Sequence, residues 1–251
     1  MLTLVGLGLY DEKDLTLRGI EAAKSADKVY IELYTSVWRG KENLEKMIGK
    51  KIEELKREDL EQNTGKIVNE ANEKDIVIFV PGDPMIATTH SILIEEAEKT
   101  KIKTKIIHNA SIVSAIAETG LHIYKFGATA TVPFREKTGG KLPESVYDTI
   151  KMNRNNGLHT LLLLDITLGR SMIANDAIQT LLAIEKQRKE GVFTDDAEIV
   201  VFARVGSDDS KIWYGHVKEL GETDFGEPPM VIIIPGIMHF TEKEFLVKFT
   251  H

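Results

Sequence analysis

Short apolar runs of strand length alternate with segments of helical periodicity along most of this chain. Such alternation is typical of βα units arranged around a mostly parallel sheet. We predict strands at residues 2–5, 28–33, 75–80 and 103–107. Helices are expected after a cap at Asp14 and at residues 89–100 and 111–118, and the charged stretch 42–62 predicts a short helix and a short strand.

The pattern changes in the second half of the chain. Strands are predicted at residues 158–165, 198–204, 211–217 and 230–235, and the middle two flank a hairpin-type connection. A long helix is expected at 171–189, with Ile173, Ala177, Leu181 and Ile184 on its inner face. Thr241 and Glu244 have the spacing of a capping box for a final helix, whereas residues 137–143 have no periodicity and predict a loop.

These patterns predict an α/β protein with two α/β domains, a mainly parallel N-terminal sheet and a mixed C-terminal sheet. No linker of distinctive composition marks the boundary, which we place within residues 112–125 and draw as domains 1–115 and 116–251.

Composition excludes several classes of protein. The 251-residue chain has no cysteine, so disulfides, thiolate metal sites and a cysteine nucleophile are excluded. Its net charge of -7 disfavours a broad nucleic-acid-binding face. The apolar runs are shorter than the roughly 20 residues of a membrane span, and the first residues lack the pattern of a signal peptide. We therefore expect a cytoplasmic protein without membrane or direct nucleic-acid binding.

Gly6 and Gly8 follow the first predicted strand and precede a helix. Glycines in this position let the backbone approach a ligand closely. The dinucleotide fingerprint would need a further glycine at position 11, where the sequence has Asp11. A nicotinamide-dinucleotide site is therefore disfavoured, and both a ligand-binding loop and a plain tight turn remain open.

Two other loops follow strands at the edge where open α/β sheets bind ligands. In the first, Pro81 and Pro84 enclose Gly82 and Asp83, which makes the loop stiff as well as polar. Asp83 is either a ligand contact or a bond to local amides. Ser111, in the second loop, is either a ligand contact or a helix N-cap.

Catalytic signatures are sparse elsewhere. The histidines lack metal-ligand spacing, and no Gly-x-Ser-x-Gly element is present. Asp165 ends an apolar strand, where an aspartate commonly caps the next turn. We assign no metal and no catalytic acid or base. The residues alone indicate an enzyme acting on a small molecule that they do not name.

Several segments, taken together and in this order, resemble the tetrapyrrole-methylase superfamily, and more closely its diphthine synthase family. The Gly-Asp-Pro loop indicates only the superfamily, whereas segments such as Ala-Thr-Thr-His and Gly-Val-Phe-Thr-Asp-Asp are similar to diphthine synthases specifically. The matching segments are 5–11, 16–21, 32–36, 81–90, 120–127, 157–162, 191–196 and 224–229.

This resemblance implies a methyltransferase that uses S-adenosylmethionine, releases S-adenosylhomocysteine, holds its cofactor in a cleft between the two domains and forms a homodimer. The implied substrate is a histidine of translation elongation factor 2 that already carries a 3-amino-3-carboxypropyl group. Successive methyl transfers to its amine would give diphthine. The resemblance also implies a set of cofactor contacts: Leu9, Asp83, Ile86, Ser111, Ile112, Leu164, Val205 and Met230.

One position departs from the family, which can have histidine where this chain has Met230. A side-chain hydrogen bond to the cofactor is therefore not expected there, although a main-chain contact is. Two other classes remain open. One is a sister methyltransferase acting on a corrin or porphyrin precursor, and the other is a non-catalytic module that binds a translation factor.

Overall fold

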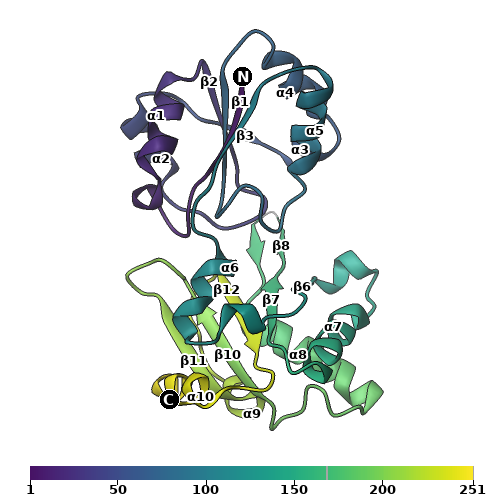
Figure 1. Ribbon diagram of the computed structural model, residues 1–251. Helices are drawn as coiled ribbons and strands as arrows, with labels where there is room; N and C mark the ends of the chain where they lie inside the picture. Colours follow the sequence, from purple (N-terminus) through teal and green to yellow (C-terminus); the bar gives the residue numbers. More distant parts are fainter. Residues whose placement is uncertain (168, 251) are drawn as a thin grey trace. The chain divides into compact units, whose positions relative to one another are not determined.

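The computed structural model describes residues 1–167 and 169–250. Contacts divide the chain into two compact units, Met1–Ala115 (unit 1) and Ile116–His251 (unit 2), each with its own sheet and core (Figure 1).

Unit 1 is built on a five-stranded sheet in the order β3-β2-β4-β1-β5. All of its strand pairs are parallel, which confirms the predicted parallel sheet. The strands are β1 (Leu2–Gly6), β2 (Lys28–Glu32), β3 (Glu53–Leu55), β4 (Ile76–Val80) and β5 (Thr104–Ile107).

Helices cover both faces of this sheet (Figure 1). Alternate residues of β1 explain why, because Leu4 packs in a core with Leu93 of α5, whereas Val5 packs in a core with Ala23 of α1. The connection after β1 thus runs over one face and the connection after β4 over the other. Adjacent strands with diverging connections form the switch point at which such sheets bind ligands. The helices are α1 (Leu17–Ser25), α2 (Lys41–Ile48), α3 (Arg57–Glu61), α4 (Thr64–Glu70) and α5 (Ser91–Lys99).

Unit 2 has a five-stranded sheet in the order β11-β10-β12-β7-β6. The pair β6–β7 is parallel and the other pairs are antiparallel, which confirms the predicted mixed sheet. The strands are β6 (Ala130–Val132), β7 (Thr160–Leu164), β10 (Glu198–Ala203), β11 (Lys211–His216) and β12 (Met230–Ile234), with a separate short pair β8 (Ile166–Thr167) and β9 (Arg170–Ser171).

Two long helices, α7 (Glu144–Asn155) and α8 (Ala174–Arg188), pack on one face of this sheet through a single apolar core. Shorter helical segments complete the chain: α6 (Ile112–Ala115), α9 (Val217–Leu220), α10 (Phe240–Leu246), η1 (Glu12–Asp14), η2 (Ile116–Thr119), η3 (Ile123–Lys125), η4 (Arg135–Thr138) and η5 (Val247–Phe249).

Two predicted helix starts are wrong. Helix α1 is capped by Thr16, whose hydroxyl accepts the Gly19 N–H at 3.1 Å, and not by Asp14. Helix α10 has its capping box at His239 and Glu242, and not at Thr241 and Glu244. In each case several polar residues compete for the same turn, and the choice depends on tertiary contacts that local spacing does not contain.

The long helix of unit 2 also begins later than predicted, at Ala174, so that Ile173 is the N-cap residue and not part of the inner face. Helices α4 and α7 and strand β6 were not predicted. In α7 the apolar spacing of Val146, Tyr147 and Ile150 ends at Asn153, a buried polar residue that obscures the stripe.

Candidate functional site

The loops that follow β1, β4 and β5 are joined at the carboxyl edge of the sheet in unit 1. Gly82 N donates to Gly8 O at 2.8 Å, and Gly8 N donates to Gly82 O at 3.2 Å. Asn109 Nδ2 donates to Gly6 O and to Asp14 O, each at 3.0 Å. A Cβ atom on Gly6 would lie 2.6 Å from Gly82 O, so only glycine permits this approach.

Asp83 links two of these loops. Its carboxylate is almost wholly buried, and Oδ1 accepts the Met85 N–H at 3.0 Å. Oδ2 accepts Asn109 N–H at 3.2 Å and His108 Nδ1–H at 2.8 Å. The Asp83 side chain therefore bonds a local amide, as one of its two interpretations predicts, and it also fixes the loop after β4 against the loop after β5.

Unit 1 has three buried polar atoms without a hydrogen-bond partner within the described residues: Trp38 Nε1, His90 Nε2 and Ser111 Oγ. They follow β2, β4 and β5 respectively. Leaving a buried polar group unpaired costs about 1–3 kcal/mol, so such groups need an explanation. All three lie in segments that follow the carboxyl ends of parallel strands, which is the side on which open α/β sheets bind ligands.

Ser111 is the most informative of the three. It is 4% exposed, and its hydroxyl caps no amide of the helix that follows. Instead, Ser114 Oγ accepts the Ser111 N–H at 3.2 Å. Gly82 lies beside it, with a φ of +68° that favours glycine, and a Cβ atom on Gly82 would lie 3.5 Å from the Ser111 Cβ, an ordinary van der Waals distance. The N-cap interpretation of the Ser111 side chain is therefore wrong.

The other predicted contacts of unit 1 lie in the same loops. Leu9 N donates to Asp14 Oδ2 at 3.0 Å, so this amide is already bonded within the protein. Ile86 N donates to Asp83 O at 3.2 Å, and the Ile86 side chain is 39% exposed. Ile112 begins α6, directly after Ser111.

The three predicted contacts of unit 2 are also brought together. Leu164 ends β7, and the pairing of Val231 with Leu163 places Leu164 beside the start of β12, at Met230. Met230 pairs with Ala203 at the end of β10, and Val205 follows two residues later. Met230 and Val205 are buried. One edge of this sheet therefore carries all three residues.

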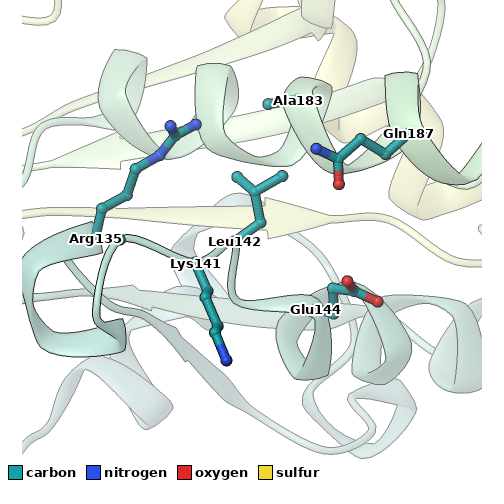
Figure 2. Close-up of a pocket in the computed structure, with 7 residues that line it drawn as sticks. Arg135, Lys141, Leu142, Glu144, Ala183 and Gln187 are labelled. Carbon is teal, nitrogen blue, oxygen red and sulfur yellow. The ribbon is translucent and has the colours of Figure 1, made fainter.

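Asp165 orders the loop next to this edge. Its carboxylate accepts Phe134 N–H at 2.9 Å and Lys137 Nζ–H at 2.6 Å. That loop borders a pocket of about 600 Å³, in which Arg135 and Leu142 extend toward Ala183 of α8 while Lys141 points away (Figure 2). None of the predicted contacts lines this pocket. The residues that line it are Arg135, Gly140, Lys141, Leu142, Glu144, Ala183 and Gln187.

A buried polar cluster that the sequence did not reveal lies elsewhere in unit 2. Glu242 is inaccessible to solvent and accepts from Lys125 Nζ at 2.5 Å and from His159 Nε2 at 3.0 Å. It also accepts the backbone N–H groups of His122 and His239, at 2.8 and 2.6 Å. Although burial opposes ionisation, these bonds together lower the pKa of Glu242 to about 2. Segments 120–127 and 157–162 thus meet here in a fully bonded structural cluster.

Glu32 is a third buried carboxyl, at the end of β2. It accepts Thr35 Oγ1–H at 2.6 Å and Thr35 N–H at 3.3 Å. Burial raises the pKa of Glu32 to about 7, because these two bonds do not replace the water lost by the charged form.

The arrangement offers little for covalent or metal catalysis. The described residues hold no cluster of side chains suited to a metal ion, and within them Ser111 Oγ bonds no histidine that would activate it. No helix in the described part of the chain is long and apolar enough to span a membrane. The groups that the site does offer are the Ser111 hydroxyl and the backbone of the joined loops, which suit the binding of a ligand.

Comparisons with known proteins identify the family of this chain. The sequence profile of the tetrapyrrole (corrin/porphyrin) methylases matches residues 1–221. A diphthine synthase of Methanocaldococcus jannaschii is 48% identical over 252 residues, covering 98% of this chain and 97% of the relative. A diphthine synthase of Methanococcus aeolicus is 46% identical over 250 residues, covering 98% and 96%. A crystal structure of diphthine synthase superposes with a TM-score of 0.91 at 40% identity, covering 99% of this chain and 95% of that one.

The chain belongs to the tetrapyrrole methylases and, within them, to the diphthine synthase family. It is a methyltransferase, which confirms the enzyme class that the sequence predicts.

Proposed function

We propose that this enzyme transfers methyl groups from S-adenosylmethionine to the amine of the 3-amino-3-carboxypropyl histidine of translation elongation factor 2, giving diphthine. The unpaired buried hydroxyl of Ser111 carries the cofactor part of this proposal, since it lies at the ligand-binding edge of the parallel sheet. The family of the close relatives supports the substrate.

The residues at this edge fit such a cofactor. Ser111 Oγ offers a donor and an acceptor, and Gly82 beside it has no side chain to fill the space. Ile86 presents an exposed apolar side chain. We propose Leu9, Asp83 and Ile112 in unit 1, and Leu164, Val205 and Met230 in unit 2, as the remaining contacts. All of these residues except Asp83 are apolar, and the Asp83 carboxylate is already bonded within the protein. We therefore expect free backbone groups and the shape of the apolar side chains to bind the cofactor.

S-adenosylmethionine supplies a methyl group on a sulfonium, which is already activated for transfer. The task of the protein is then to align the amine and exclude water. The loops after β1, β4 and β5 suit that task because hydrogen bonds fix them to one another. No side chain is assigned as a proton acceptor. Following the resemblance, we expect the enzyme to work as a homodimer.

A second candidate is methylation of a tetrapyrrole precursor, which the profile match over residues 1–221 favours. The two substrates are distinguished by one experiment. The enzyme and S-adenosylmethionine are incubated with elongation factor 2 that bears the aminocarboxypropyl histidine, and separately with the unmodified factor. Intact-protein mass spectrometry should show stepwise increments of one methyl group on the modified factor alone. No increment on either factor, from an enzyme that binds the cofactor, would refute the substrate and retain the superfamily.

A further inference from the structure

The segment from Pro84 to His90 forms a closed turn between β4 and α5. His90 Nδ1 contacts Pro84 O at 3.2 Å, so the side chain of the N-cap residue of α5 reaches back across the loop. Ala87, at the middle of the turn, has a φ of 55°, a left-handed conformation that is strained for alanine. Such a conformation persists only where surrounding contacts hold it.

The hydrogen bond to Pro84 O determines which nitrogen of the His90 ring carries a proton. A carbonyl oxygen only accepts, so Nδ1 must carry the proton that binds Pro84 O. His90 is 1% exposed, and burial, the largest influence, lowers its pKa despite the bond to Pro84 and the charge of Glu61. The ring is therefore neutral near pH 7, with a lone pair on Nε2 that no described residue meets.

Ile86, the most exposed of the predicted cofactor contacts in unit 1, lies within this closed turn. Asp83 holds the turn on one side, through Met85 N and Ile86 N. His90 holds it on the other side. The only further hydrogen bond within the turn among described residues is local, from His90 N–H to Thr88 Oγ1 at 3.4 Å, and it does not reach Pro84.

We propose that His90 is a positioning residue: by donating Nδ1–H to the Pro84 carbonyl, it keeps the turn that carries Ile86 in the shape that binds the cofactor. This inference rests on the proposed use of S-adenosylmethionine. It assigns to the histidine of the Ala-Thr-Thr-His segment a function that does not require contact with substrate.

Two substitutions separate the hydrogen bond from the bulk of the ring. His90→Phe keeps a ring of similar volume and removes the donor, whereas His90→Asn places an amide N–H near the position of Nδ1. His216→Phe is the matched control, since His216 Nδ1 likewise bonds a carbonyl, Asp196 O at 2.9 Å, at the N-terminus of α9. His216 lies at the opposite end of the β10–β11 pair from Val205.

Two readouts are needed: backbone amide exchange of residues 85–89 without ligand, and the Kd of S-adenosylmethionine by calorimetry. We expect His90→Phe to speed exchange and raise Kd about three- to tenfold, since one hydrogen bond contributes about 1 kcal/mol. The thermal midpoint should fall by about 2–4 °C, as expected for the loss of one hydrogen bond. His90→Asn should restore both values to within about twofold of wild type, and His216→Phe should change neither.

Unaltered exchange in His90→Phe would overturn the inference, as would faster exchange with an unaltered Kd. Wild-type protein that binds no S-adenosylmethionine would instead refute the proposed function, and with it the cofactor part of this inference. The exchange measurement would still decide whether His90 closes the turn.

Discussion

The carboxyl edge of the sheet in unit 1 and the Glu242 cluster in unit 2 use similar residues in opposite ways. Both contain a buried histidine beside a loop, and both include segments typical of the family. In unit 1, Ser111 Oγ and His90 Nε2 are buried and have no hydrogen-bond partner among the residues that the structure describes. In unit 2, Glu242 accepts four hydrogen bonds, and His159 uses both ring nitrogens, since Nδ1 accepts Gly236 N–H at 2.9 Å.

The difference indicates what each region contributes. A polar cluster bonded within the protein contributes to stability and chain geometry, whereas unpaired polar atoms at a sheet edge lower stability until a ligand pairs them. Family resemblance alone does not make this distinction, because its segments occur in both regions. Measurements of stability and of affinity should therefore respond differently in the two places.

The largest effect is expected from Glu242→Gln, which removes the charge that pairs with Lys125 inside unit 2. Breaking a buried ion pair costs about 3–5 kcal/mol, and we expect a loss of this size in the free energy of unfolding measured with urea. Glu244→Gln, on the exposed side of the same helix, should change it by less than about 0.5 kcal/mol. Equal effects of the two variants would contradict the assigned role of the cluster.

The Glu32 carboxyl should make stability depend on pH in the opposite direction from most acids. In the folded protein the pKa of Glu32 is about 7, above its ordinary value of 4.5. The contribution of Glu32 to the free energy of unfolding is therefore fully present below pH 4.5 and is lost as the pH rises through 7. Between pH 5 and 8, the free energy of unfolding of the wild type should fall by up to about 3 kcal/mol relative to Glu32→Gln. Parallel pH profiles for the two proteins would exclude this behaviour.

The smallest effect concerns two hydroxyls three residues apart. Ser111→Ala removes an unpaired group, so the ligand-free protein should be no less stable, while the Kd of S-adenosylmethionine rises about three- to tenfold. Ser114→Ala removes a hydroxyl that bonds Ser111 O at 2.9 Å and should cost about 1 kcal/mol of stability. Calorimetry and urea unfolding of both variants test the comparison, which fails if Ser111→Ala destabilises the protein and leaves Kd unaltered.

The sequence predicts the sheets well because strand runs and their order are local signals. The runs at 2–5, 75–80 and 103–107 become β1, β4 and β5, which lie side by side in the sheet with β1 in the middle of the three. Their parallel direction follows from the helices that connect them. The hairpin of β10 and β11 is predicted for the same reason. The segment 42–62 likewise contains the expected short helix and strand, α2 and β3.

Partners that are distant in sequence could not be predicted. Glu242 bonds the amide of His122 across 120 residues, and Asn109 bonds Gly6 across 103. Nothing in the local sequence distinguishes Glu242 from the exposed Glu244. The unpaired state of the Ser111 hydroxyl could not be predicted either, because the side chain of a serine at the start of a helix normally caps that helix.

The register of β1 has a consequence for synthesis of the protein. Leu2 pairs with Ile76 on one side and with Thr104 on the other, so β1, an inner strand of the sheet in unit 1, is made before both of its neighbours. At translation rates of about 5–20 residues per second, β1 waits on the order of 5–20 seconds for β5 to emerge. Until β4 emerges, the apolar residues of β1 have neither neighbouring strand to pair with, and the parallel pairing that forms afterwards is intrinsically slow. A nascent chain arrested before β4 would therefore expose a strand whose residues are all buried in the finished protein.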